Sequence, residues 1–259
     1  MQTKQKLISV GALAALVALI VTGLALAKPT VVRTGNLVLK IDGGVSPTAL
    51  PKGKMAPITL RASGRLATND GSHPPATREV TIDFDKHGTI NAKGMPKCSS
   101  GKLQSQDTKA AVAVCRKAIV GRGKTSVEVE FADSKPFSAK GPLVLFNGGV
   151  RGGVTTMYIH AYVNVPAPTA IVTTVKIKKI RKGPFGTRAV AMIPKIAGGA
   201  GSLTSFDFKI HKTFMYKGKR QSYLLARCAN GRFKAHATLK ADDGTRISGE
   251  IIRPCGQRG

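Results

Sequence analysis

The sequence predicts a mainly β protein, built as one or two antiparallel β-sandwiches with a single short α-helix near residues 107–119. Three observations support this prediction. Short segments alternate apolar and polar residues with a period of two, as strands with one buried face do. Turn dipeptides rich in Gly, Asn and Asp separate these segments. One window has a helix start signal, a run of helix formers and a stop signal.

The strand pattern recurs from residue 37 to the end of the chain. In one segment, for example, Val127, Val129 and Phe131 alternate with two glutamates. Such alternation places the apolar side chains on one face of a sheet. The expected strands span 37–41, 58–66, 80–84, 127–131, 142–147, 154–163, 171–180, 187–193, 203–210, 223–228, 233–239 and 246–252.

The end of the chain predicts a three-stranded meander. Asn230-Gly231 is a dipeptide favoured in type I′ hairpin turns, and Asp243-Gly244 is a second one. The strands before, between and after these turns would then lie side by side. Such a meander would bring Cys228 and Cys255 to the same end of the sheet.

The helix has recognisable boundaries. Ser105 or Asp107 can cap its N-terminus, and Gly121 supplies a stop. Arg116 and Lys117 fall in the last turn, where positive charge suits the helix dipole.

A proline-bearing segment, 165–169, divides the chain. We expect a signal segment or N-terminal anchor over 1–27, a β-rich domain with the helix over 28–165, and a basic β-rich domain over 166–259. A single continuous sandwich is the alternative to the two β-rich domains.

The four cysteines form an even set, which in an exported chain indicates disulfides. We expect the pairs Cys98–Cys115 and Cys228–Cys255, because each closes a local loop. The sequence has no C-x-x-C motif, and no histidine lies at zinc-ligand spacing from a cysteine. We therefore expect neither a metal nor another cofactor.

The N-terminus predicts export. Lys4 and Lys6 precede an uncharged run, 7–27, which ends in Ala25-Leu26-Ala27. A positive start, an apolar middle and a small-residue exit are typical of a cleaved secretory signal. Because the run is 21 residues long, an uncleaved membrane anchor is the alternative. Either reading places the protein in the cell envelope or medium, outside the cytoplasmic membrane.

Charge is the strongest functional cue. The chain has 41 Lys+Arg against 13 Asp+Glu, a net charge of +28, and 171–259 alone carries 19 basic and 4 acidic residues. This excess predicts association with an anionic wall polymer, an acidic glycan or an anionic membrane surface. General basicity without a binding site is the alternative. The candidate polyanion-binding residues are Lys176, Lys178, Lys179, Arg181, Lys182, Lys217, Lys219 and Arg220.

Nucleic acid is not an expected partner. The aromatic content of 5% is low for a groove that binds single strands by stacking. Export also separates the protein from genomic DNA.

Enzymatic motifs are weak. Gly123-Lys124-Thr125 resembles the end of a phosphate-binding loop, but a helix precedes it and a strand follows, which is the reverse of the functional order. Ser99 and Lys102 match the S-x-x-K spacing of a serine nucleophile and its lysine. The S-D-N and K-T-G motifs that accompany this pattern in such enzymes are missing from the sequence. We therefore expect a non-enzymatic binding or structural protein.

The alternative is a secreted glycan hydrolase that uses strand carboxylates. Such chemistry would require Asp83 and Asp85 to lie next to Glu128 and Glu130 in one cleft. The other interpretation is that these carboxylates lie on solvated strand faces and pair with Lys and Arg.

A last set of motifs is spread over most of the chain beyond residue 27: Asp70-Gly71, 78–85, 94–98, 114–121, 142–147, 165–168, 183–187 and 223–228. Together these segments resemble those of a group of exported proteins of high-G+C bacteria to which no activity is assigned. The resemblance implies export and a β-fold with paired cysteines, and nothing catalytic.

Overall fold

The computed structural model describes residues 28–164 and 167–258. The expected signal segment, 1–27, and residues 165–166 of the proline-bearing segment lie outside the described residues. The described chain is mainly β with one short α-helix, which confirms the predicted fold class.

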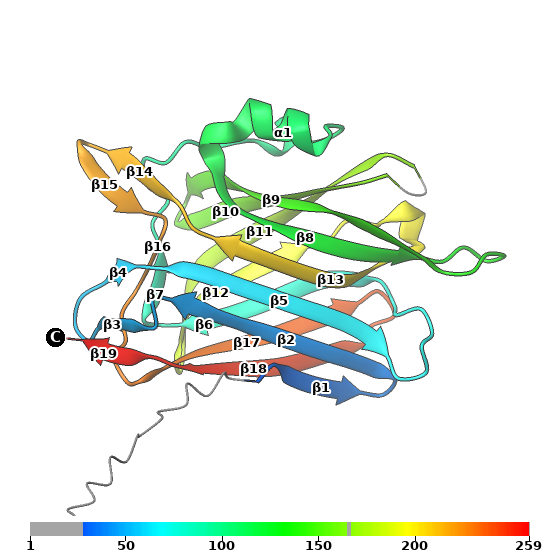
Figure 1. Ribbon diagram of the computed structural model, residues 1–259, viewed down its shortest axis with the longest axis horizontal. Coiled ribbons are helices and arrows are strands. Elements are labelled where there is room, and N and C mark those ends of the chain that lie inside the picture. Colours follow the sequence, from blue (N-terminus) through cyan, green and yellow to red (C-terminus); the bar gives the residue numbers. More distant parts are fainter. Residues whose placement is uncertain (1–27, 165–166, 259) are drawn as a thin grey trace, which may run out of the picture.

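A 12-stranded sheet forms most of the molecule and folds back on itself (Figure 1). All of its strand pairs are antiparallel. Its first and last strands approach each other, and the Thr30 hydroxyl donates to the Glu250 carbonyl over 3.0 Å. In spatial order the strands are β1 (Thr30–Thr34), β2 (Leu37–Ser46), β5 (Thr59–Thr68), β13 (Gly201–Ile210), β8 (Ile119–Val129), β9 (Phe137–Arg151), β10 (Val154–Val163), β11 (Thr169–Lys182), β12 (Phe185–Met192), β6 (Thr77–Asp85), β17 (Arg232–Ala241) and β18 (Arg246–Pro254).

Three small sheets gather at one end of this large sheet, on the left in Figure 1. One has three strands, one is an antiparallel hairpin, and one is a parallel pair, which departs from the expected antiparallel pattern. They comprise β4 (Ala56–Pro57), β16 (Leu224–Ala226) and β7 (Gly88–Ile90); β14 (Thr213–Tyr216) and β15 (Lys219–Ser222); and β3 (Ala49–Pro51) and β19 (Gly256–Arg258).

The helix α1 (Thr108–Cys115) lies over the outer face of β9 and β10. Of the two expected caps, Asp107 is the one used, because its side chain accepts from the Ala110 amide over 2.7 Å. The helix ends earlier than predicted: a short 3-10 turn, η2 (Arg116–Ala118), follows and leads directly into β8. Gly121, the expected stop, is a residue of that strand.

Gly121 has a packing role in β8. A Cβ at this position would lie 2.5 Å from the Lys209 carbonyl oxygen, so only glycine allows β8 and β13 to approach this closely. The other short 3-10 turns are η1 (Ser100–Lys102) and η3 (Ala197–Gly199).

Strands from the two expected β-rich domains are interleaved in the large sheet. From the C-terminal part, β13 lies between β5 and β8. From the N-terminal part, β6 lies between β12 and β17. The segment around 165–166 joins β10 to its neighbour β11. The structure therefore has no separate main sheet for either expected domain.

The expected C-terminal meander is wrong in one strand. The hairpin of β17 and β18 forms as predicted, with Lys240 opposite Arg246. The preceding strand β16, however, pairs with β4 and β7 in another sheet. The reason is that β6 occupies the free edge of β17, so that edge is no longer open to β16.

Both expected disulfides, Cys98–Cys115 and Cys228–Cys255, are present, with Cα–Cα distances of 5.7 and 6.0 Å. The first ties the loop before α1 to the end of that helix. The second forms although the meander does not, because the Cys255 amide donates to the Gly231 carbonyl over 2.9 Å and so turns the tail inward. Paired buried cysteines indicate an oxidising compartment.

Candidate functional site

The first group of expected polyanion-binding residues lies along β11. Lys176 and Lys178 are exposed on the outer face of the sheet, while Ile177 between them is buried in the core. This follows from the alternation of side chains along a strand. The pairing of β11 with β12 shifts register between Lys179 and Lys182, and Lys179, Arg181 and Lys182 are all exposed there.

A shallow hollow of about 430 Å³ lies on this outer face. It brings Lys176 and Lys178 next to Arg151, which sequence analysis did not select. The Lys176 ammonium donates to the Thr156 hydroxyl over 3.0 Å. Arg151 ends β9, and only the β9–β10–β11 pairing places it beside these lysines. The hollow is lined by Arg151, Val154, Thr156, Lys176, Lys178 and Val190.

The cations of the hollow are not neutralised. Within 28–164 and 167–258, no carboxylate lies within 4.0 Å of the Arg151, Lys176 or Lys178 side chains. Arg188 lies opposite Lys178 on the next strand, but it pairs with Asp83. Three exposed positive charges beside a hydroxyl suit an anionic oxygen group such as a phosphate or a carboxylate.

The second group of expected residues lies elsewhere. Lys217, Lys219 and Arg220 belong to the β14–β15 hairpin, which is a sheet of its own. All three are exposed, and Lys217 and Gly218 form the turn with positive φ of 50° and 71°. The eight predicted residues therefore lie on two separate elements of the fold.

The four carboxylates considered for glycan hydrolysis do not share a strand pair. Four strands separate β6, which carries Asp83 and Asp85, from β8, which carries Glu128. Asp83 pairs with Arg188, and Glu130 lies exposed after the end of β8. The juxtaposition that this chemistry would require is not present.

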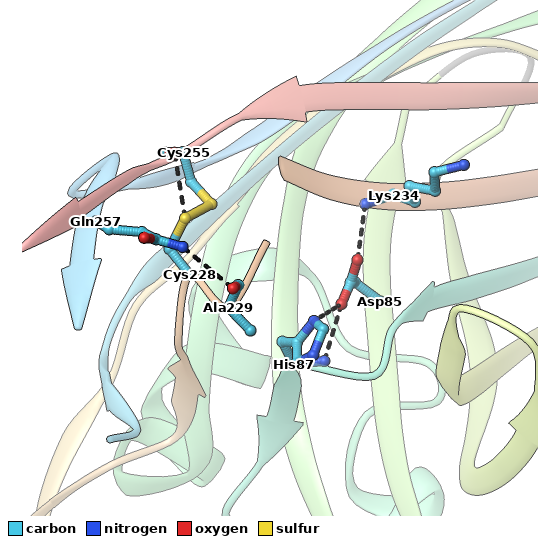
Figure 2. The surroundings of a disulfide bond; sticks show 7 residues. All are labelled: Asp85, His87, Cys228, Ala229, Lys234, Cys255 and Gln257. Carbon is cyan, nitrogen blue, oxygen red and sulfur yellow. Dashed lines mark hydrogen bonds and ion pairs between the residues drawn. A yellow bond between two sulfur atoms is a disulfide. The ribbon is translucent and has the colours of Figure 1, made fainter. Parts of the chain in front are cut away.

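Asp85 is buried and holds two segments together (Figure 2). Its Oδ1 accepts from the His87 amide over 2.9 Å and lies 2.8 Å from the His87 Nδ1. Its Oδ2 accepts from the Lys234 amide over 3.1 Å. Asp85 thus joins the β6–β7 turn to β17, so its contacts are structural.

Glu128 belongs to a network that sequence analysis missed. His73 Nδ1 lies 3.0 Å from Glu128 Oε1, and His73 Nε2 lies 3.1 Å from the Ser202 hydroxyl. This order of groups matches that of a serine hydrolase triad. Ser202, however, is 1% exposed and donates to the Pro74 carbonyl. A substrate cannot reach this hydroxyl, so the network fastens the loop before β6 to β8 and β13.

The inner faces of the large sheet line an apolar cavity of about 300 Å³. Sequence analysis did not foresee the cavity, since periodicity shows which side chains point inward but not how far apart the walls stand.

Tyr223 lies in the wall of this cavity and is fully buried. Its hydroxyl has no hydrogen-bond partner in the part of the chain that the structure describes. Burial raises the pKa of this phenol above its usual value of 10.0, so the hydroxyl keeps its proton. Tyr223 is thus a neutral donor in apolar surroundings.

Within 28–164 and 167–258, no group of three or more His, Cys, Asp or Glu side chains could hold a metal ion. Among the same residues, no helix is both long enough and apolar enough to cross a membrane. No family model, curated protein or solved structure matches the chain.

Proposed function

We propose that the protein is an exported, non-enzymatic binding protein of the cell envelope or extracellular space, which associates with an anionic wall polymer through the hollow on the outer face of β9–β12. The observation that carries this proposal is the set of three cations, Arg151, Lys176 and Lys178, which no carboxylate within 4.0 Å neutralises among the described residues. The two disulfides support the exported location.

The remaining basic residues strengthen this attraction over a longer range. Lys179, Arg181 and Lys182 continue the line of charge along β11. At low salt such charges act over about 10 Å, and at about 1 M salt over about 3 Å. Binding to a polyanion also releases counterions, so affinity should fall steeply as salt rises.

The test is retention of the full chain on purified cell envelope across a salt series from about 0.1 M to about 1 M. The variant Arg151→Glu/Lys176→Glu/Lys178→Glu should lose most retention at the lower salt. The matched control, Lys93→Glu/Lys102→Glu/Lys117→Glu, removes three exposed cations elsewhere and should lose much less. A third variant, Lys217→Glu/Lys219→Glu/Arg220→Glu, measures the contribution of the β14–β15 hairpin.

Three outcomes would contradict the proposal. Equal loss in the hollow variant and the control would mean general basicity without a site. Retention that does not depend on salt would mean that charge does not drive binding. Retention on vesicles of anionic lipid, but not on envelope stripped of lipid, would replace the polymer by a membrane surface.

A further inference from the structure

The inner cavity is separate from the basic hollow, because the two lie on opposite faces of the sheet. On β12, for example, Ala189 and Ala191 line the cavity, while Val190 between them lines the hollow. Nothing in the proposed polymer binding requires this inner space.

Small side chains keep the centre of the sheet open. Ala189 and Ala191 on β12 point inward, and Ala235 and Ala237 do the same on β17. On the strand next to β12, β11 presents larger aliphatic side chains, including Ile171 and Ile177. The lining is almost wholly apolar, which excludes sugars, nucleotides and other highly polar ligands.

Gly64 of β5 allows the Phe206 ring to approach that strand closely. A Cβ at Gly64 would lie 2.5 Å from the ring. The ring of Phe206 therefore fills the place that a β5 side chain would take. It stacks on Phe208, with 5.7 Å between the ring centroids, and both rings line the cavity.

The cavity extends along the strands. Its lining on β11 runs from Ile171 to Ile177, six strand steps or about 20 Å. That length accommodates an extended aliphatic chain.

The cavity comes closest to the unpaired edges of the sheet beside β2 and β18, the β2–β18 seam. In the described part of the chain, no backbone–backbone hydrogen bond joins β18 to β1 or β2; the edges are held by apolar packing and by the hydrogen bond from the Thr30 hydroxyl to the Glu250 carbonyl. The cavity reaches both edges, at Gly43 and Gly44 on β2 and at Ile251 on β18. A Cβ at Gly44 would meet no atom within 4 Å. An Arg253–Asp42 ion pair crosses the seam at the same level.

We propose that this cavity binds a molecule with one long aliphatic chain, either a free fatty acid or a single-chain lipid, which enters through the β2–β18 seam. The chain lies against the inner face of β11, β12 and β17, along the alanines of β12 and β17 and the aliphatic side chains of β11. The buried Tyr223 hydroxyl provides a hydrogen-bond donor in the wall for an oxygen of the ligand.

The experiment is calorimetric titration of the full chain, with both disulfides intact, by fatty acids of increasing length and by lysophosphatidylcholine. We expect one saturable site, affinity that rises about fourfold per added methylene until the cavity is full, and a negative heat-capacity change. Binding of the fatty acid alone means that the whole molecule is enclosed. Equal binding of lysophosphatidylcholine means that its headgroup stays outside the seam. Binding of neither overturns the proposal.

Two variants on adjacent positions of β12 locate the site. Ala191→Phe fills the cavity and should weaken binding at least tenfold, whereas Met192→Phe places the same ring on the outer face, where Met192 is 53% exposed, and should leave binding unchanged. Ala191→Val is a smaller change that should weaken binding less, and it serves if the Phe variant does not fold. Equal effects of Ala191→Phe and Met192→Phe, or no effect of either, would place binding outside the cavity and overturn the proposal.

Discussion

Asp83 and Arg188 form a bidentate ion pair across neighbouring strands of the large sheet. The Arg188 Nε and Nη2 donate to the two carboxylate oxygens of Asp83 over 2.6 and 2.8 Å. The Asp83 side chain is 4% exposed and that of Arg188 is 31% exposed. Hydrogen bonds from Arg188 hold the pKa of Asp83 below its usual value of 3.8. This carboxylate is therefore committed to the sheet and is not free for catalysis.

Replacing Asp83 should reveal the strength of this pair. We expect Asp83→Asn to lower the free energy of unfolding by about 2 kcal/mol at neutral pH, because Arg188 loses a charged acceptor. Asp207→Asn is the control, since its pair with Arg61 is exposed and should be worth less than about 1 kcal/mol. Urea denaturation measures both. Equal losses would show that the Asp83 pair has no special strength.

The same pair predicts a pH dependence. A carboxyl group whose pKa is lower in the folded state stabilises the protein above its unfolded pKa of 3.8, and this contribution is lost as the pH falls through the folded pKa. The difference in stability between the native protein and Asp83→Asn should therefore shrink below about pH 4. A difference that stays constant down to pH 2 would contradict this assignment.

His160 is buried below α1 and predicts a second pH dependence, at milder acidity. Burial lowers its pKa below 6.5, against the opposing effects of its hydrogen bond to the Gln106 carbonyl, at 2.9 Å, and of the Asp107 charge. As the pH falls below 6.5, His160 therefore binds a proton in the unfolded chain but not in the folded chain, so the free energy of unfolding decreases. His160→Gln should reduce this loss between about pH 7 and pH 5, whereas exposed His211→Gln should not. Thermal unfolding across this range provides the measurement.

Gly94 should tolerate no side chain. Its φ is +75°, and a Cβ would lie 2.0 Å from the ring of Tyr216 in the β14–β15 hairpin. Gly71 has a similar φ of +78° but no atom within 4 Å, so it isolates the backbone cost. We expect Gly71→Ala to cost about 1 kcal/mol and Gly94→Ala at least about 2 kcal/mol. Hydrogen exchange should also increase in β14–β15 in the second variant only.

The disulfides should contribute comparable free energies. In the chain-entropy description, loops of 17 and 27 residues stabilise by about 3 and about 3.5 kcal/mol. Cys98→Ser/Cys115→Ser should loosen mainly α1 and the loop before it. Cys228→Ser/Cys255→Ser should weaken the main core, to which both cysteines belong. Denaturation with hydrogen exchange by segment distinguishes the two, and identical exchange patterns would contradict the assignment.

Local patterns in the sequence were sufficient for many features. Alternation identified most strands of the large sheet, Asp107 was one of two expected caps, and both disulfide pairs were predicted. These features depend on neighbours within about 30 residues. The exposure of Lys176 and Lys178 likewise follows from the period of β11.

Partner choice among distant strands was decided by the tertiary structure alone. Many edges of similar strands can satisfy the same hydrogen bonds, so the pattern of one strand does not say that β6 rather than β16 pairs with β17. The same holds for Arg151, which reaches Lys176 only through the β9–β10–β11 register, and for the Glu128–His73–Ser202 network. The cavity depends on the distance between the inner faces of the sheet. That distance is set only when all the strands have paired and their inward side chains have packed.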